Sequence, residues 1–367
     1  MILKTPGPEF RMKMTKVFII VLVWMLIGAI INCYDYFTLH AHISGGTANS
    51  FSFLRNLVFN MLAGIMGGVL GGSFLVFIAN EKFRNKAYWI GIAAVTMSFF
   101  VIVGIITVSL ATVASLIETG KPLFDPETKN AFSNFVMDSF HLKNMVVWSC
   151  VVALTQFFLQ VNDKFGQGVL WSLIMGKYHS PREEERVFMF ADLASSTTIA
   201  EKLGHKNYHH LLKDFFADIT PAIIHNRGEI YQYVGDEIVI SWKMKNGIDK
   251  NRCVLCYFDM SKAIQNLKAK YESVYGLVPE FKAGLHYGKV IAGEVGIIKR
   301  DITYSGDVLN TAARIQSKCN EYQVKILSSD ELLALLSFGS MFKQIPIGEI
   351  ELKGKGNKVA LSTLQLL

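Results

Sequence analysis

Charged residues are scarce in this chain of 367 residues: they make up 18% of it, whereas hydrophobic residues make up 51%. About a quarter of the residues of a soluble globular protein are charged. Together with the mean hydropathy of +0.31, this excludes a wholly soluble enzyme and an intrinsically disordered chain. Cysteine is also scarce, and its odd count of five argues against a disulfide framework and favours a reducing compartment. We therefore expect a membrane protein with a soluble remainder.

The hydrophobic excess lies in the first half of the chain. About 20 apolar residues suffice to cross ~30 Å of hydrocarbon, and four runs approach or exceed that length. The second run is rich in glycine, which allows close helix packing, and the fourth is the shortest and contains Gln156 and Gln160. The four predicted membrane helices span residues 17–33, 57–79, 88–117 and 145–161.

Basic residues flank these runs unevenly and predict the orientation. Cytoplasmic flanks are enriched in lysine and arginine, and here such residues precede the first run and separate the second from the third. Both termini are therefore expected on the cytoplasmic side of the inner or plasma membrane. The first ten residues show no secretory pattern, and whether they are native is left open. Asp35, His40 and His42 lie at the other end of the first run, where interfacial solvation is the simpler interpretation.

The remainder of the chain changes character after the fourth run. Residues 163–176 have the pattern of a short amphipathic helix, which Ser180 and Pro181 then interrupt. Strand-like stretches (187–193, 229–242 and 281–296) then alternate with helix-like ones (197–224, 253–271 and 308–319), which predicts an α+β domain with a partly antiparallel sheet. The predicted organisation is a cytoplasmic segment (1–16), a transmembrane domain (17–161), a linker or signalling helix (162–182) and a soluble domain (183–367).

Two aspartates of the soluble part occupy unusual positions. Asp192 is expected at the end of strand 187–193, before a small polar turn and a helix. Asp236 is expected at the tip of hairpin 229–242, where Gly235 permits the turn. One such aspartate alone would be interpreted as a helix cap. Two on facing elements favour a hydrated cation that bridges phosphates, with the backbone N–H groups of residues 193–197 as further phosphate ligands.

Five segments carry a resemblance to a known family. In this order and spacing they resemble the catalytic domain of class III nucleotidyl cyclases, from about Gly176 to the C-terminus, and the layout is similar to membrane-anchored bacterial members. The resemblance implies a ferredoxin-like mixed sheet with flanking helices, so that residues 183–367 would be the catalytic domain. The segments are FADLASST, YVGDEIVISW, AGLHYGKVIAGEVG, KRDITYSGDVLNTAARIQ and ELKGKG.

The resemblance also implies roles for individual residues. Asp192 and Asp236 would bind two Mg²⁺ or Mn²⁺ ions per active site, assisted by the backbone carbonyl of Leu193. Asn310 would position the ribose, and Arg314, four residues further on the same predicted helix, would stabilise charge on the reacting phosphate. Further substrate-binding positions are Ala194, Ser195, Ser196, Thr197, Gln232, Thr303 and the triphosphate-binding Lys353.

In this family the metal carboxylates and the Asn/Arg pair meet across a subunit interface. One chain here supplies both halves, so the resemblance implies a head-to-tail homodimer with two equivalent sites. A monomer would then be inactive. The transmembrane helices would pair as well, giving about eight in the dimer.

The residues at the base-binding positions do not decide which base the site would recognise. Adenylate cyclases of the best-known type have Lys and Asp where this chain has Gln232 and Thr303, and guanylate cyclases usually have Glu at the first of these positions. A Gln amide both donates and accepts hydrogen bonds, so it suits adenine or guanine. Family frequency favours ATP; GTP and the pyrimidine triphosphates stay open.

The leading hypothesis is a membrane-bound adenylate cyclase that converts ATP to 3′,5′-cyclic AMP and pyrophosphate. Enzymatic alternatives are a guanylate or pyrimidine nucleotide cyclase and a diguanylate cyclase, although Val234 replaces the first glycine of the GGDEF signature. A degenerate membrane scaffold or nucleotide sensor, or a small transporter with a regulatory domain, would be non-enzymatic. We expect no nucleic-acid partner, because no basic stripe contains interleaved aromatic residues. A ligand of the transmembrane domain, from the membrane or the extracytoplasmic side, is not identified by the sequence.

Overall fold

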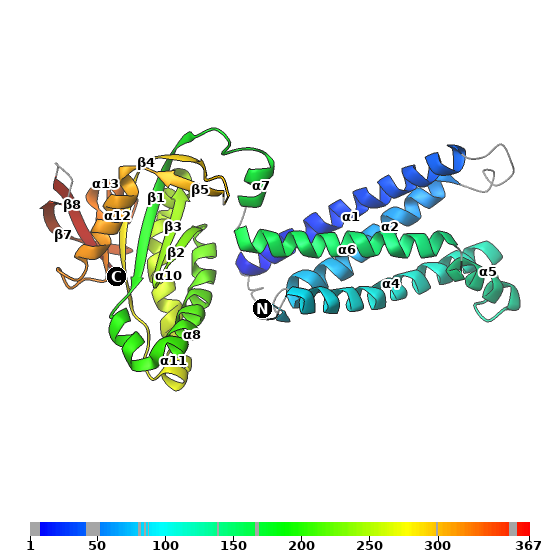
Figure 1. The fold of residues 1–367 in the computed structure, drawn as a ribbon, viewed down its shortest axis with the longest axis horizontal. Coiled ribbons are helices and arrows are strands. Elements are labelled where there is room, and N and C mark those ends of the chain that lie inside the picture. The colour runs from blue at the N-terminus through cyan, green and yellow to red at the C-terminus, as the bar shows by residue number, and fades with distance from the viewer. Residues whose placement is uncertain are drawn as a thin grey trace. The chain divides into compact units, whose positions relative to one another are not determined.

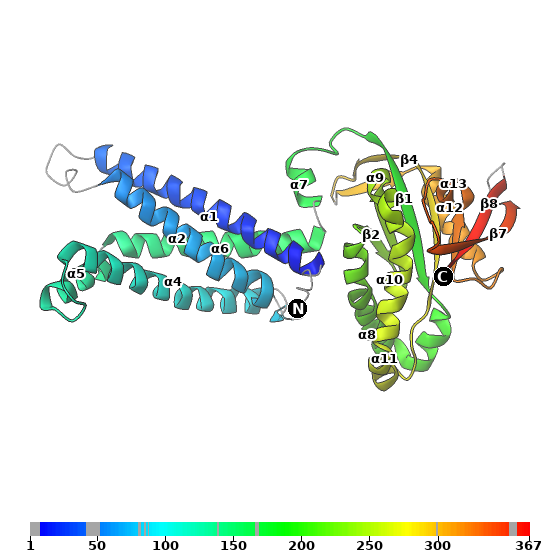
Figure 2. The same ribbon diagram turned by 180° about the vertical axis from the view of Figure 1, so that it is seen from behind.

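The computed structural model describes residues 8–41, 52–79, 82–83, 86, 88–137, 139–165, 169–298, 300–351 and 358–367. Contacts within the chain divide it into two compact units, Met1–Lys164 and Phe165–Leu367. The first unit is helical and the second contains the sheet (Figures 1 and 2). Each unit is described by itself.

Four long helices make up most of the first unit. Within the described residues, four segments are long and apolar enough to cross a membrane, as the sequence predicts: Phe10–Thr38, Phe53–Ala79, Trp89–Thr119 and Lys143–Asp163. A short helix in the region before the last of them was not predicted. The elements are α1 (Pro8–Ala41), α2 (Phe53–Ser73) with its π-helical continuation η2 (Phe74–Ala79), α4 (Tyr88–Thr119), the short α5 (Pro126–Met137) and α6 (Ser139–Phe165).

Glycines of α2 let this helix lie directly against α1. A Cβ atom on Gly64 would lie 2.7 Å from the carbonyl oxygen of Trp24, and one on Gly68 would lie 2.7 Å from the Cα atom of Val21. No side chain larger than hydrogen fits at those distances. The prediction of close packing by the glycine-rich helix is therefore confirmed, and the small-residue face of α2 makes the contact.

Asp35 corrects one expectation from the sequence. Its side chain is only 3% exposed and forms an ion pair with Lys143 of α6, so it is not solvated at an interface. The reason is tertiary: the two residues are 108 positions apart and meet only when α1 and α6 pack together. His42 and the side chain of His40 lie outside the described residues.

The predicted linker helix is shorter in the structure than in the sequence pattern. Residues 163–165 continue α6, and the separate helix α7 covers only Val169–Ile174. The first strand then begins at Arg182, directly after Pro181. The amphipathic pattern therefore extends over two different helices rather than one.

The second unit has the ferredoxin-like arrangement that the resemblance implied. Its sheet has the strand order β2-β3-β1-β4-β6-β8-β7, with β5 paired to β4 alone. The first four strands and the helices α8 and α10 alternate as βαββαβ. The sheet is mixed because β4 and β6 are parallel, whereas β1 is antiparallel to both β3 and β4.

Most elements of this unit were expected, but the C-terminal strands were not. The predicted elements appear as β1 (Arg182–Leu193), α8 (Ser196–His225), β2 (Glu229–Val234), β3 (Glu237–Lys243), α10 (Arg252–Asn266), α11 (Lys268–Tyr275), β4 (Phe281–Val295) and α12 (Asp307–Lys318). The additional ones are α9 (Met244–Ile248), η3 (Asp249–Asn251), β5 (Asp301–Ser305), β6 (Ile326–Ser329), α13 (Asp330–Leu333), β7 (Phe342–Glu351) and β8 (Lys358–Leu366).

Both faces of the central strand β1 are buried, because successive side chains of a strand point to opposite faces. Val187 and Met189 face the large core formed with α8 and α10. Phe188 and Phe190 face a smaller core that includes Val308 of α12. Figure 1 shows the sheet between these two layers. The arrangement holds the end of β1, and with it Asp192, at a fixed place beside α12.

Candidate active site

Asp192 and Asp236 come together at one edge of the sheet. In the register between β1 and β3, Asp192 lies opposite Glu237, the residue that follows Asp236. Gly235 and Asp236 form the two-residue turn between β2 and β3, and Gly235 has a φ of +64°, which glycine adopts without strain. The hairpin therefore places the Asp236 carboxylate beside that of Asp192, close enough to share a hydrogen bond when one of them is protonated.

The electrostatics of this pair are unfavourable in the protein alone. Burial and the neighbouring Asp236 raise the pKa of Asp192 to about 6. A hydrogen bond from Gln316 has the opposite, smaller effect on this pKa. Burial and the charges of Asp192 and Asp236 raise the pKa of Glu237 to about 7. Among the described residues, no lysine or arginine forms an ion pair with either aspartate. Clustered carboxylates with no basic neighbour would be relieved by a bound cation.

The donor set fits a hard divalent cation. Within the part of the chain that the structure describes, His, Cys, Asp and Glu form no cluster of three with the arrangement of a metal site. The protein would therefore supply two carboxylates, and the backbone carbonyl of Leu193 is adjacent. Mg²⁺ is typically bound by one or two carboxylates, with water and substrate phosphates completing its shell. The residues present match that preference.

The turn between β1 and α8 holds the predicted phosphate-binding positions. Ser195 has a positive φ of 55° and its side chain does not cap the helix. The N–H group of Ala194 donates to the carbonyl oxygen of Glu280 at 2.7 Å, so it is not free to bind phosphate. The first N–H groups of α8, from Ser196 and Thr197 onward, have no acceptor within the helix. Such N–H groups, at the positive end of the helix dipole, can bind an anion.

Asn310 and Arg314 lie on α12, but the structure does not bring them to the aspartates of the same chain. Gln316 is the residue of α12 that reaches the pair: its Nε2 atom lies 3.4 Å from Oδ2 of Asp192. At about 100° per residue, Arg314 lies roughly 200° around the helix from Gln316. The side chains of Asn310 and Arg314 form no hydrogen bond or ion pair with any described residue.

Gln232 and Thr303 belong to β2 and β5, which meet through neighbouring tyrosines. The rings of Tyr231 and Tyr304 are 4.9 Å apart, and the N–H group of Tyr304 donates to the Tyr231 hydroxyl at 3.3 Å. Gln232 is exposed, and the Thr303 hydroxyl reaches the carbonyl oxygen of Gly293 at 3.5 Å. Lys353 lies outside the described residues.

Two residues of the site were not found from the sequence. Glu237 directly follows Asp236, so the alternation of the strand could have indicated that it pairs with Asp192. Gln316 gives no such local signal. Its contact depends on α12 packing closely on β4, which Gly284 permits: a Cβ atom there would lie 2.6 Å from the carbonyl oxygen of Ala312 and would overlap the backbone nitrogen of Gln316.

Comparison with known proteins gives a consistent result. Residues 179–364, just over half of the chain, match the family described as the adenylate and guanylate cyclase catalytic domain. The chain is 37% identical over 208 residues to "Adenylate cyclase 2" of Rhizobium meliloti, a match covering 57% of each protein. It is 27% identical over 192 residues to "Adenylate cyclase 1" of the same organism, which covers 50% of this chain and 28% of that protein.

A solved structure has the same fold. A bacterial light-regulated adenylyl cyclase superposes with a TM-score of 0.53 and 21% sequence identity, over 62% of this chain and 67% of that one. The chain thus spans just over half of the length of the first curated relative and less than a third of the second. The shared part contains the sheet, the aspartate pair and α12. The chain belongs to the family of adenylate and guanylate cyclase catalytic domains, the class III cyclases.

Proposed function

We propose that this protein is a membrane-bound adenylate cyclase that converts ATP to 3′,5′-cyclic AMP and pyrophosphate. The observation that carries the proposal is the pairing of Asp192 with Asp236 beside the first turn of α8, with no basic residue of the described chain paired to either carboxylate. Such a site suits the triphosphate of a nucleotide and its cations. The similarity to two adenylate cyclases of Rhizobium meliloti supports ATP as the substrate.

Each proposed residue has a separate task. Asp192 and Asp236, with the carbonyl of Leu193, would hold two Mg²⁺ or Mn²⁺ ions; bound there, such ions would supply activation of the ribose 3′-hydroxyl and neutralisation of charge on the phosphates. The backbone N–H groups of Ser195, Ser196 and Thr197, at the start of α8, bind the triphosphate. Lys353 also binds the triphosphate. Ala194 contributes shape rather than a hydrogen bond, because its N–H group is already bonded to Glu280.

Asn310 and Arg314 complete the site from the other side. Asn310 orients the ribose, and the guanidinium of Arg314 stabilises the charge that develops on the α-phosphate during transfer. Gln232 and Thr303 contact the base. The Gln232 amide donates through its NH₂ group and accepts through its oxygen, so it can pair with both the acceptor and the donor of adenine. Guanine is the alternative base.

We further propose that the working form is a head-to-tail homodimer with two equivalent sites. Two observations support it. Around the axis of α12, Arg314 lies about 160° and Asn310 about 120° from Gln316, so both are turned away from the aspartate of their own chain that Gln316 contacts. Beyond the end of β4, the side chains of Ile297 and Ile298 are 93% and fully exposed, respectively, which is typical of a surface that is covered in an assembly.

The helical unit is the proposed anchor of this dimer. Four of its helices are long and apolar enough to cross a bilayer. The excess of lysine and arginine at the N-terminal end of α1 and between η2 and α4 supports a cytoplasmic location for both termini and the catalytic domain. α7 and its flanks are the proposed route by which the helical unit would act on the catalytic domain.

Complementation between two variants tests the function and the dimer together. Asp236→Asn and Arg314→Ala should each lack turnover as homodimers, assayed on the full-length protein in detergent with Mn²⁺ and ATP, GTP, CTP or UTP. Co-expression should restore about a quarter of wild-type turnover, because half of the dimers then carry one intact site of two. Co-expression of Asp236→Asn with Asp192→Asn is the matched control and should stay inactive, since both defects fall in the same half-site.

Three outcomes would contradict the proposal. Full turnover in Asp236→Asn would remove the metal assignment. Failure of the first pair to complement, in dimers shown to contain both variants, would place the whole site within one chain. A wild-type dimer that forms no product from any of the four triphosphates would favour a non-enzymatic nucleotide sensor.

A further inference from the structure

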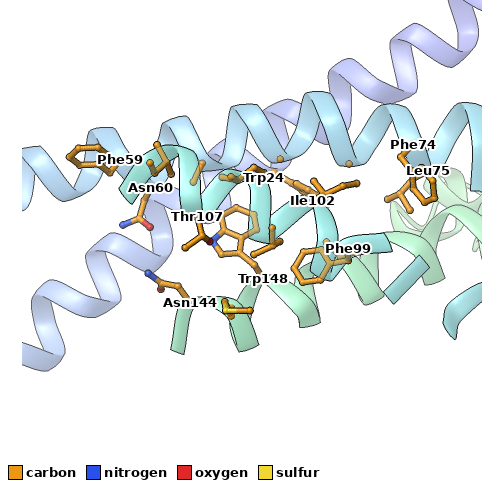
Figure 3. A pocket seen from close by; sticks show the side chains of 18 of the residues that line it. Trp24, Phe59, Asn60, Phe74, Leu75, Phe99, Ile102, Thr107, Asn144 and Trp148 are labelled. Carbon is orange, nitrogen blue, oxygen red and sulfur yellow. The ribbon is translucent and has the colours of Figure 1, made fainter. Parts of the chain in front are cut away.

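The helical unit contains a cavity of about 130 Å³. It is lined from every helix of the unit: α1, α2 with η2, α4, α5 and α6 (Figure 3). An engineered cavity of about 150 Å³ in another protein accommodates benzene. The cavity is slightly smaller than that one, so it suits a molecule of about the size of one aromatic ring.

One end of this cavity is polar and the rest is apolar. Figure 3 shows Asn60, Thr107 and Asn144, from α2, α4 and α6, grouped toward one end, with Phe74 and Phe99 further along. None of the described lining residues carries a charge. The cavity therefore favours a neutral molecule with an apolar body and a single polar group.

The polar side chains at that end have no partner within the described protein. The Oδ1 atom of Asn144 is buried and makes no hydrogen bond. Thr107 is the clearest contrast, because other hydroxyl residues of α4, such as Thr96 and Thr112, donate to the carbonyl four residues earlier, whereas no hydrogen bond of the Thr107 hydroxyl is present. Asn60 likewise makes no side-chain hydrogen bond with a described residue. Asn60 and Thr107 are half-buried, whereas the Asn144 oxygen is buried and lacks the hydrogen bond that buried polar atoms normally have.

The wall beside the polar end is aromatic and firmly positioned. The rings of Trp24 and Trp148 are 5.8 Å apart, and the Nε1 atom of Trp24 donates to Thr155 at 3.0 Å. Gly67 and Gly71 lie under the Trp24 ring, since a Cβ atom on either would come within 3.3 Å of it. Trp24 is thus held in place by its own contacts, and its indole N–H group is not available to a ligand.

We propose that the helical unit binds a neutral, phenol-sized molecule in this cavity. Its hydroxyl group donates to Oδ1 of Asn144 and accepts from the amide of Asn60 or the hydroxyl of Thr107, while its ring lies against the Trp24 and Trp148 side chains. This site is separate from the aspartate pair of the catalytic unit and does not depend on the proposed cyclase activity.

Quenching of tryptophan fluorescence tests the site without measuring turnover. The full-length protein in lipid nanodiscs is titrated with 4-bromophenol, whose bromine quenches a contacting indole, and with bromobenzene, which lacks the hydroxyl. We expect saturable quenching by 4-bromophenol that unlabelled phenol competes away. Bromobenzene should bind at least tenfold more weakly, because it leaves the Asn144 oxygen unsatisfied.

Variants locate the quenching. Ala63→Phe, which fills the cavity from α2, should abolish saturable quenching by both probes. Ala153→Phe, on the exposed surface of α6, is the matched control and should leave it unchanged. Asn144→Leu preserves side-chain volume but removes the acceptor, so 4-bromophenol should bind about tenfold more weakly while bromobenzene is unaffected.

Three results would overturn the proposal. Non-saturating quenching that is the same in wild type and Ala63→Phe would mean that the probe only partitions into the bilayer. Quenching by lipids with brominated acyl chains, lost in Ala63→Phe and insensitive to phenol, would assign the cavity to a lipid chain. Unchanged 4-bromophenol binding in Asn144→Leu would mean that the polar end of the cavity does not contact the ligand. This result does not depend on whether Ala63→Phe folds.

Discussion

Gln316 donates a hydrogen bond to Asp192, with 3.4 Å between Nε2 and Oδ2. The buried face of α12, which includes Val308 and Ala312, sets the rotation of the helix about its axis, and in that rotation Gln316 faces the aspartate pair of its own chain. Asn310 and Arg314 are consequently directed away from that pair. This geometry within one subunit is the basis for the proposal that a second subunit completes the site.

The metal assignment predicts a severe effect of a small change. Asp236→Asn preserves the shape of the turn that Gly235 begins but removes one of the two carboxylate charges. We expect the turnover number with ATP and Mn²⁺ to fall by at least ~100-fold, since charge stabilisation by bound cations is worth several kcal/mol. Circular dichroism of the variant should match that of the wild type. An intact fold with near-normal turnover would contradict the assignment.

The pKa values predict how stability depends on pH without divalent cations. The pKa of Asp192 is raised to about 6 and that of Glu237 to about 7, so between about pH 4 and pH 7 the folded state binds more protons than the unfolded state. Stability should therefore fall as pH rises through this range. The thermal midpoint in EDTA should decrease from pH 5 to pH 8, and less steeply in Asp236→Asn, which removes a charge beside Asp192.

Addition of Mg²⁺ at pH 8 is the control for that experiment. A cation bound by the ionised pair should raise the thermal midpoint of the wild type and have little effect on Asp236→Asn. A wild-type midpoint that increases between pH 5 and pH 8 in EDTA would be inconsistent with the raised pKa values.

Gly284 predicts a packing defect with a functional consequence. In Gly284→Ala, the new methyl group would overlap the backbone of α12, and relief requires the helix to move. We expect a loss of roughly 1–3 kcal/mol of stability and a marked loss of turnover, because α12 carries Asn310 and Arg314. Gly293→Ala on the same strand is the matched control, since its Cβ atom would make only ordinary contacts at 3.4 Å or more. Equal effects of both changes, measured by urea unfolding, would refute this explanation.

Arg186 predicts a large effect of removing a buried charge. Its side chain is 1% exposed and donates to Glu184 at 2.8 Å and to Glu229 at 2.7 Å. Arg186→Leu leaves Glu229 without its cation and Glu184 with Lys177 alone, and we expect it to cost about 3 kcal/mol of unfolding free energy. Glu229→Gln should cost under about 1 kcal/mol, because Glu229 is 42% exposed. Chemical denaturation of both variants would distinguish the buried partner from the exposed one.

The base preference is predicted to depend on Gln232. In Gln232→Glu, the amide that can both donate and accept becomes a carboxylate that only accepts. Guanine offers adjacent N–H donors on its Watson–Crick edge, so the ratio of kcat/KM for GTP over ATP should rise by about tenfold, equal to ~1.4 kcal/mol. Gln232→Met should lower both values without favouring GTP. An unchanged ratio in Gln232→Glu would mean that this residue does not contact the base.

The sequence predicts what is local and misses what depends on packing. Hydrophobic runs and strand alternation suffice for the four long helices and for the strands that carry Asp192 and Asp236. The edge strand β7 and its neighbour β8 were missed because their burial depends on neighbours distant in the sequence. The contact of Gln316 with Asp192 was missed because it requires α12 to lie on the sheet. Asp35 was misinterpreted for the same reason.

The pairing of Asp35 with Lys143 has a consequence for how the protein is made. The carboxylate of α1 leaves the ribosome long before the lysine of α6, so for most of the insertion of the helical unit this acid has no ion-pair partner among the helices already synthesised. A buried carboxylate without a cation is costly in hydrocarbon. In the proposed membrane anchor we therefore expect the first helix to adopt its final depth only after α6 has been inserted, so that α6 completes the bundle.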